Sequence, residues 1–247
     1  MLSLKDERLP KALVDALRPV TVIVGHYGTG KTNLAINLAI DLARAGNAAT
    51  LIDLDVVNPY FRASEQRVDL ESEGVKLIAP VFAEAGTSLD VPSLTGRIVP
   101  AIEEASDDSV VIIDAGGDDV GATALGRFAR YIAAKDYAMI CVLNRYRNLV
   151  QDPEDALENL REIEEASHLK ATGLISNAHM KAETAPSHIK EGLRYAHEVE
   201  ALCGLPLAAY TVPRIDGKTV PFDDDAIDGD SASAYHVNMH VRTPWER

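Results

Sequence analysis

The fold of this chain is decided by the stretch Gly25-His26-Tyr27-Gly28-Thr29-Gly30-Lys31-Thr32. This stretch matches the phosphate-loop pattern G-x-x-x-x-G-K-[ST], the Walker A motif, at every fixed position. The apolar run Thr21–Val24 precedes it, and a segment with helical spacing begins near Lys31. A glycine-rich turn between a strand and a helix, without a ligand, is the alternative. The strand–loop–helix context favours the phosphate loop, because the motif requires that context.

Each part of this loop has a predicted role in holding the phosphates of a nucleoside triphosphate. Glycines let backbone N–H groups point at phosphate oxygens, and the start of the next helix adds a partial positive charge. Lys31 is predicted to reach the β- and γ-phosphates, and the Thr32 hydroxyl is predicted to bind Mg²⁺. The predicted nucleotide-binding residues of this segment are Gly25, His26, Tyr27, Gly28, Thr29, Gly30, Lys31, Thr32 and Asn33.

Short apolar runs alternate with longer segments of helical periodicity, which predicts βαβ units around a parallel sheet. The fold class is therefore α/β, with a sheet of about seven strands and helices on both faces. The strands are predicted at Thr21–Val24, Ala49–Leu54, Val75–Ala79, Val110–Ile113, Ala138–Leu143, Thr172–Ser176 and Leu207–Val212.

We predict one domain over residues 1–247, because no linker or internal repeat interrupts the pattern. Residues 1–19 are expected to form an N-terminal helical extension, and residues 214–247 an acidic C-terminal tail. The end of this tail is expected to return to the body through a set of apolar side chains: Tyr235, Val237, Met239, Val241 and Trp245.

The charge balance argues against binding to nucleic acid or to a membrane surface. The chain has 24 Lys and Arg against 38 Asp and Glu, a net charge of −14, and no basic patch is visible. Cys141 and Cys203 form no CxxC pair, which argues against a zinc or iron–sulfur site. No apolar run approaches the ~20 residues that a membrane span needs. We therefore expect a cytoplasmic protein.

Acidic residues follow two of the predicted strands at the sheet edge where α/β proteins bind ligands. Asp55 is predicted to position the attacking water and to lie in the outer shell of Mg²⁺, and Asp114 to bind Mg²⁺ in the manner of a Walker B aspartate. Asp53 carries less weight, because a single acid at a strand end is often a turn former. Gly117 completes a D-x-x-G arrangement whose N–H can face a γ-phosphate, a switch element. The predicted catalytic residues are Lys31, Asp55 and Asp114.

Four segments together resemble a known group of proteins. They are GHYGTGKTN (25–33), DLDVVNPYFR (53–62), DAGGDDVGATALGRF (114–128) and TGLISNAH (172–179). They are similar to a bacterial family of ATP-binding proteins among the deviant-Walker P-loop ATPases, the MinD/ParA/nitrogenase-iron-protein superfamily of the SIMIBI class. The resemblance spans about residues 20–213. It implies the three-layer fold of a P-loop NTPase, with a doubly wound, mostly parallel sheet. It also implies Mg-ATP binding and, frequently, a homodimer that forms with ATP.

The chain departs from this superfamily inside the loop. Many members carry a second lysine directly after the first loop glycine, where it reaches the nucleotide of a dimer partner, and here that position is His26. An imidazole is a weaker phosphate partner than an ammonium group. His26, Arg62 or Arg145 can replace that charge, but a plain surface residue is the favoured interpretation of each.

Adenine is the favoured base, because the N-K-x-D signature of guanine-specific proteins is missing. No acid stands at the third position after Asn144 or after Asn177. By resemblance, Asn177 contacts the adenine and the backbone near Pro213 closes the pocket. A buried asparagine that caps a helix is the competing interpretation of Asn177.

Three functions remain open on the sequence. The favoured one is an ATPase, converting ATP and water to ADP and phosphate, whose nucleotide state controls association with an unidentified protein partner. The second is an ATP-dependent small-molecule kinase or ligase, with chemistry like that of dethiobiotin synthetase. The third, a positioning ATPase of the ParA or MinD kind, is weakest because the tail carries Asp223-Asp224-Asp225 where membrane binding needs basic residues.

Overall fold

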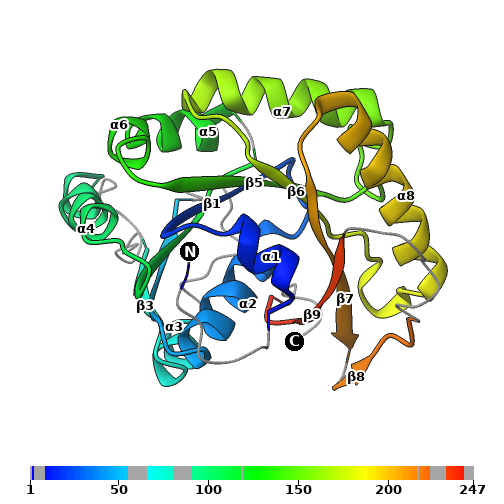
Figure 1. The fold of residues 1–247 in the computed structure, drawn as a ribbon, viewed down its shortest axis with the longest axis horizontal. Helices are drawn as coiled ribbons and strands as arrows, with labels where there is room; N and C mark the ends of the chain where they lie inside the picture. The colour runs from blue at the N-terminus through cyan, green and yellow to red at the C-terminus, as the bar shows by residue number, and fades with distance from the viewer. Residues whose placement is uncertain are drawn as a thin grey trace, which may run out of the picture.

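A single nine-stranded sheet forms the centre of the protein in a computed structural model (Figure 1). The structure describes residue 2 and residues 9–54, 66–79, 91–117, 119–215, 217–222 and 232–241. The strand order is β3-β2-β4-β1-β5-β6-β7-β8, and β9 also pairs with β7. The strands are β1 Val20–Val24, β2 Ala48–Asp53, β3 Lys76–Ile78, β4 Ser109–Asp114, β5 Tyr137–Leu143, β6 Gly173–Ser176, β7 Leu207–Ile215, β8 Lys218–Thr219 and β9 Ser233–Asn238.

Helices cover both faces of this sheet (Figure 1). One hydrophobic core joins the sheet to side chains of α4 through α8, and the other joins it to α1, α2 and α3. The helices are α1 Lys11–Ala16, α2 Lys31–Arg44, α3 Arg67–Ser72, α4 Val91–Glu103, α5 Asp119–Gly126, α6 Ala129–Ile132, α7 Pro153–Ser167 and α8 Pro186–Cys203, with a short 3₁₀ helix, η2, at Lys181–Glu183. Two covered faces explain why every residue of β1 is buried.

The predicted α/β class and the seven predicted strands are all present, in a sheet whose pairings are parallel except that of β7 with β8. The sheet has two strands beyond the predicted seven, and both come from the segment expected to be an acidic tail. β9 forms because Tyr235 and Val237 alternate with polar residues, as in a strand with one buried face. Trp245 lies outside the described residues.

The C-terminal strand is fastened to α2, the helix that follows the phosphate loop. The Tyr235 hydroxyl donates to Asp41 at 2.8 Å, and Asn37 exchanges two hydrogen bonds with the backbone of Asn238, at 2.8 and 2.9 Å. The end of the chain's described part therefore packs against the helix that begins at the phosphate loop.

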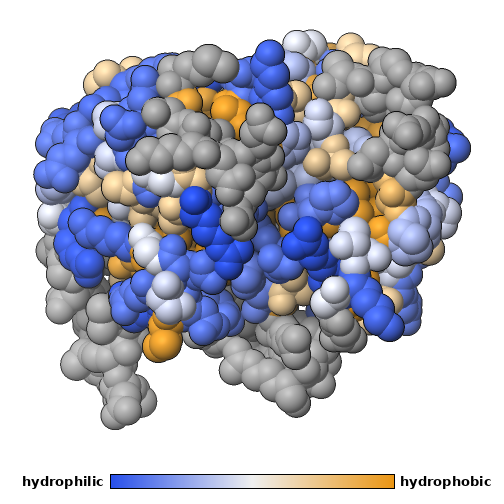
Figure 2. Space-filling model, turned by 60° about the horizontal axis from the view of Figure 1, so that its bottom comes forward, coloured by the Kyte–Doolittle hydropathy of each residue, from blue (hydrophilic) through white to orange (hydrophobic). Residues whose placement is uncertain are grey.

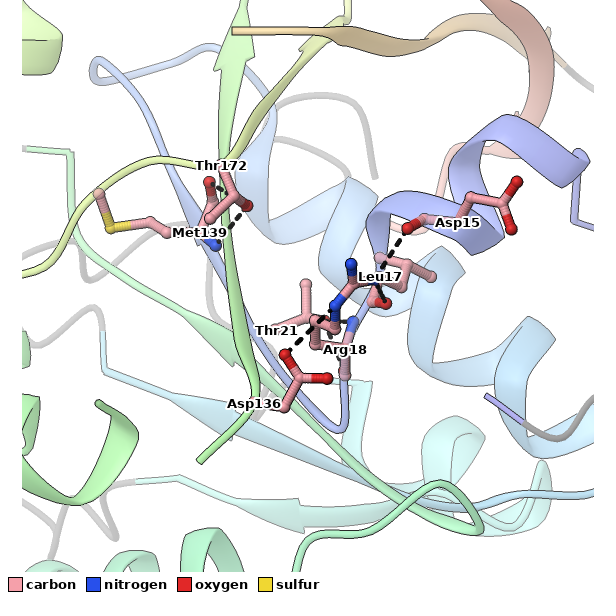
Figure 3. A network of polar contacts seen from close by, with 7 residues as sticks. All are labelled: Asp15, Leu17, Arg18, Thr21, Asp136, Met139 and Thr172. Carbon is pink, nitrogen blue, oxygen red and sulfur yellow. Dashed lines mark hydrogen bonds and ion pairs between the residues drawn. The ribbon is translucent and has the colours of Figure 1, made fainter. Parts of the chain in front are cut away.

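At the amino-terminal edge of the sheet, polar groups bind one another (Figure 3). The Arg18 guanidinium donates to the carbonyl oxygens of Asp15 and Leu17, both at 2.8 Å, and its Nε lies 3.3 Å from Asp136. Thr21 accepts from the Arg18 N–H and donates back to the Arg18 carbonyl. These bonds fix the connection between α1 and β1.

The face brought forward in Figure 2 is mostly hydrophilic, and its hydrophobic residues form small, separate groups. Among the described residues, none of the helices combines the length and apolar character needed to cross a membrane.

Candidate functional site

The phosphate loop lies between β1 and α2, at the carboxyl end of the central strand. Its glycines adopt left-handed φ angles of 137° at Gly25, 77° at Gly28 and 90° at Gly30. A Cβ atom on Gly25 would also lie 2.5 Å from the carbonyl oxygen of Val142 in β5. Glycine is required here, because other residues rarely adopt this backbone conformation.

One carbonyl oxygen, that of His26, closes the loop on itself. It accepts from the Thr29 N–H at 3.3 Å, the Thr29 hydroxyl at 2.9 Å and the Lys31 ammonium at 3.1 Å. The His26 ring turns toward the next residue, with Nδ1 3.1 Å from the Tyr27 carbonyl oxygen. Lys31 is therefore buried and folded back over the loop, while Tyr27 is 55% exposed.

Gly117, the glycine of the D-x-x-G arrangement, lies directly against this loop. A Cβ atom on Gly117 would lie 2.5 Å from Lys31 Nζ, 2.7 Å from the Tyr27 nitrogen and 2.9 Å from the Gly25 carbonyl oxygen. The segment after β4 can approach so closely only because it carries no side chain at this point. The sequence placed Gly117 and Lys31 in one site, and the structure brings them together.

Two buried aspartates occupy neighbouring positions where β2 and β4 end. Asp53 pairs in register with Asp114, and Asp114 also pairs with Ile23 of β1. Both acids are 1% exposed. Asp53 is thus part of the site to a greater degree than the sequence indicated, because its side-by-side position with Asp114 depends on the strand register. Asp55 lies outside the described residues.

The oxygen donors at this edge fit Mg²⁺ better than a transition metal. Thr32 stands in the first turn of α2, and Asp114 ends the strand beside β1. Across the described ranges, no cluster of three or more His, Cys, Asp or Glu side chains could hold a metal ion. Mg²⁺ does not need such a cluster, because it takes one or two protein oxygens and completes its shell with phosphate and water.

Asn177 lies beneath the phosphate loop. Its Nδ2 donates to the Thr29 carbonyl oxygen at 2.7 Å, and its Oδ1 accepts from the Thr211 hydroxyl at 2.6 Å. The amide also fills the space that a side chain on Gly30 would need. These contacts of the Asn177 amide support the phosphate loop. They leave one amide hydrogen that could be donated to a base. Sequence reasoning gave no signal for Thr211.

His179 is a buried residue of the site that sequence reasoning missed. It is 4% exposed, its Nδ1 accepts from the Lys181 N–H at 3.2 Å, and its Nε2 lies 3.6 Å from a Cβ atom placed on Gly30. Burial, with smaller contributions from Arg147 and Lys181, lowers the pKa of His179 to about 4. The ring is therefore neutral near pH 7 and carries its proton on Nε2, the nitrogen nearer to the loop.

The segment between β5 and α7 brings an arginine to the loop, and it is Arg147. Its Cδ lies 3.6 Å and its Nε 3.9 Å from a Cβ atom placed on Gly28. Arg145, the arginine that the sequence suggested, lies instead with its Cζ 6.0 Å from the ring centroid of Tyr146. Sequence alone could not separate the two, since they stand two positions apart in one loop. Arg62 lies outside the described residues.

Two predicted nucleotide contacts use their polar groups elsewhere. The Asn33 amide donates to the Asn238 carbonyl at 2.9 Å and accepts from the His240 N–H at 2.8 Å, so its backbone N–H is the group left for phosphate. The carbonyl of Pro213, within β7, accepts from the Val220 N–H at 3.1 Å.

Comparisons with known proteins agree with this geometry. Residues 20–207 match the family model described as the CobQ/CobB/MinD/ParA nucleotide binding domain. A comparison with curated proteins gave no match.

Solved structures with a similar fold include several FtsY proteins. FtsY from Mycoplasma mycoides has a TM-score of 0.54 and 18% identity, covering 87% of this chain and 70% of that one. Chloroplast FtsY from Physcomitrella patens gives 0.55 and 18%, with 89% and 67% covered. FtsY from Elizabethkingia anophelis in complex with GDP gives 0.52 and 21%, with 83% and 60% covered. At these identities the likeness concerns the fold.

Proposed function

The chain belongs to the CobQ/CobB/MinD/ParA nucleotide binding domain family, and we propose that it is a Mg²⁺-dependent ATPase whose nucleotide state controls association with a protein partner. The observation that carries this proposal is the approach of Gly117 to the phosphate loop, 2.5 Å from Lys31 Nζ when a Cβ is placed on it. A segment held this close to the lysine changes its contacts when a γ-phosphate arrives or leaves.

The chemistry assigned to the site is phosphoryl transfer from ATP to water. The loop N–H groups and Lys31 bind the phosphates, and Thr32 and Asp114 would hold Mg²⁺, which would neutralise negative charge on the phosphates. Asp55 positions the attacking water. Asp53, side by side with Asp114, is added to the acids on the Mg²⁺ side of the site.

Adenine is proposed as the base because no acid stands at the third position after Asn177, which is Met180. His179, one position before Met180, presents an N–H donor from its neutral ring. Guanine recognition by the N-K-x-D signature uses an acceptor for the guanine N–H groups. Adenine has ring nitrogens that accept hydrogen bonds, which suits donors from His179 and Asn177.

The first test compares Lys31→Ala with the wild type. Binding of Mg-ATP, Mg-ADP and Mg-GTP is measured by calorimetry, and phosphate release is measured in parallel. The wild type is expected to bind ATP at least about tenfold more tightly than GTP, and Lys31→Ala is expected to lose turnover by on the order of a hundredfold or more. Lys190→Ala, an exposed lysine on α8, is the control. Normal hydrolysis by Lys31→Ala would overturn the proposal.

The second measurement concerns the switch. The mass of the wild-type particle is measured by light scattering without nucleotide, with ADP and with a non-hydrolysable ATP analogue. A shift between monomer and dimer that depends on the γ-phosphate supports a switch. Monomers in every state, together with ADP release that requires a small-molecule acceptor, would identify a kinase or ligase instead.

A further inference from the structure

We propose that Arg147 is a ligand of the nucleotide's phosphates that acts on the site of its own chain. This inference rests on the proposed ATP site and adds a residue to it. It begins with the position of Arg147, whose Cδ and Nε lie 3.6 and 3.9 Å from a Cβ atom placed on Gly28. Gly28 is in the middle of the phosphate loop, so the guanidinium borders the phosphate cradle.

The guanidinium of Arg147 has no protein counter-charge in the part of the chain that the structure describes. Its Nε is buried without a hydrogen-bond partner. Other arginines of the chain do have partners, since Arg18 pairs with Asp136, Arg44 with Glu73 and Arg67 with Glu71. Partial burial of a cation without an anion is costly. Within the described part of the chain this guanidinium therefore has no anion, and a bound ligand can supply one.

The segment that carries Arg147 is held in place at several points. The Tyr146 hydroxyl donates to Glu191 at 3.0 Å, and the Arg147 N–H donates to the Asn144 carbonyl at 3.1 Å. The Tyr195 hydroxyl donates to the Val150 carbonyl at 2.7 Å. Within it, Leu149 keeps a left-handed φ of 69°, an unfavourable conformation for leucine. The backbone that carries Arg147 is therefore already in place before the ligand binds, which reduces the entropy lost on binding.

Phosphate is the anion that fits this position. The loop N–H groups around Gly28 are the groups that bind phosphate in this motif, and a guanidinium can donate two hydrogen bonds to phosphate oxygens. Arg147 also supplies a positive charge within one chain. It thereby does part of what a lysine at the His26 position would do from a dimer partner.

The experiment measures the dissociation constants of Mg-ADP and of a non-hydrolysable Mg-ATP analogue for Arg147→Ala. We expect both to rise about tenfold or more, because a charge-assisted, bidentate contact is lost. Arg147→Lys keeps the positive charge but not the two parallel N–H donors of the guanidinium. Its dissociation constants should therefore lie between those of Arg147→Ala and the wild type. Arg161→Ala, an exposed arginine on α7, should stay within about twofold of the wild type. Thermal unfolding of each variant checks that the fold is intact.

Mixing two variants that bind nucleotide weakly tests whether Arg147 acts within its own chain. Lys31→Ala protein keeps Arg147 but is deficient in nucleotide binding, so it can supply only an arginine in trans. We expect it not to restore tight binding to Arg147→Ala protein. Restoration would overturn the assignment to the same chain.

Two results would separate this inference from the proposed function. If Lys31→Ala weakens ATP binding while Arg147→Ala or Arg147→Gln binds like the wild type, the role of Arg147 is wrong and the ATP site stands. If the wild type binds no Mg-ATP, the proposed function itself is wrong. If Arg145→Ala weakened nucleotide binding and Arg147→Ala did not, the inference would also be overturned.

Discussion

The two edges of the same sheet treat their polar groups in opposite ways. At the amino-terminal edge, side chains close the connections between elements: Lys135 donates to the Glu103 and Ala105 carbonyls, and Arg18 donates to the Asp15 and Leu17 carbonyls. At the carboxyl edge, buried polar atoms of Asn144 and Arg147 have no hydrogen-bond partner among the residues that the structure describes.

This difference separates stability from binding. Polar groups that are satisfied within the protein stabilise the fold, whereas a buried donor without a partner is costly until a ligand accepts its hydrogen bond. At the carboxyl edge, three loop glycines with positive φ angles, Gly25, Gly28 and Gly30, shape the backbone that faces the proposed ligand. Changes at the carboxyl edge should therefore affect nucleotide binding and turnover. Changes at α1, which connects to β1 at the amino-terminal edge, should affect the free energy of unfolding.

Gly117→Ala should give the largest effect. It should reduce ATP turnover and leave the stability of the fold unchanged. Its methyl group would meet Lys31 Nζ and the backbone of Tyr27 and Gly25, so the segment after β4 must move away from the loop. We expect ATP turnover to fall on the order of a thousandfold, comparable to the loss of a group that stabilises the transition state. Steady-state phosphate release measures the effect.

The control for this change is Gly96→Ala in α4, where a Cβ atom meets nothing within 4 Å. Turnover should not change in that variant. If Gly117→Ala hydrolysed ATP at the wild-type rate, the contact between Gly117 and the loop would have no part in the reaction.

Much of the fold could be predicted because its signals are local. The core strands are predicted by apolar runs of strand length, and the loop by glycines at fixed spacing around Lys31. Neither prediction needs knowledge of distant contacts. β9 was harder to predict, because its hydrogen bonds go to Asn33, Asn37 and Asp41, about 200 positions earlier. Only two buried residues, Tyr235 and Val237, mark it as a strand.

For the candidate site, the sequence could indicate only the residues that belong to recognisable motifs. Gly117 lies against Lys31 and Asp114 lies beside Ile23 of β1, because the carboxyl ends of neighbouring parallel strands meet at one edge. The choice between Arg145 and Arg147 depends on how one loop turns, and the weight of Asp53 depends on strand register. Neither property is written in a local pattern, so both required the structure.

Leu13→Ala should give the next largest effect, and this effect should be on stability and not on nucleotide binding. Leu13 is fully buried under the sheet in α1, and removal of its side chain leaves a cavity. The free energy of unfolding should fall by about 3 kcal/mol, within the range for buried leucines. Chemical denaturation measures this loss, and calorimetry should give an ATP affinity within about twofold of the wild type. Lys11→Ala, an exposed position in the same helix, should change neither quantity. Loss of ATP affinity in folded Leu13→Ala protein would show that the two sides are coupled.

The smallest effect concerns His179, a site residue whose contribution to stability should depend on pH. Its folded pKa of about 4 lies below the ordinary value of 6.5, chiefly because of burial and also because of Arg147 and Lys181. The unfolded chain therefore binds more protons between these values, so stability is complete above pH 6.5 and is lost as the pH falls toward 4. At pH 5 this loss should be about 2 kcal/mol relative to pH 7.

Asn at position 179 offers an acceptor for the Lys181 N–H and has no titrating group, so His179→Asn should lose less stability than the wild type between pH 7 and pH 5. Denaturation curves for both proteins at the two pH values measure the difference, and groups common to both cancel in it. Equal losses in the two proteins would mean that His179 is not held neutral by burial. It would then be accessible to solvent, and the donor assigned beside Gly30 would have to come from another residue.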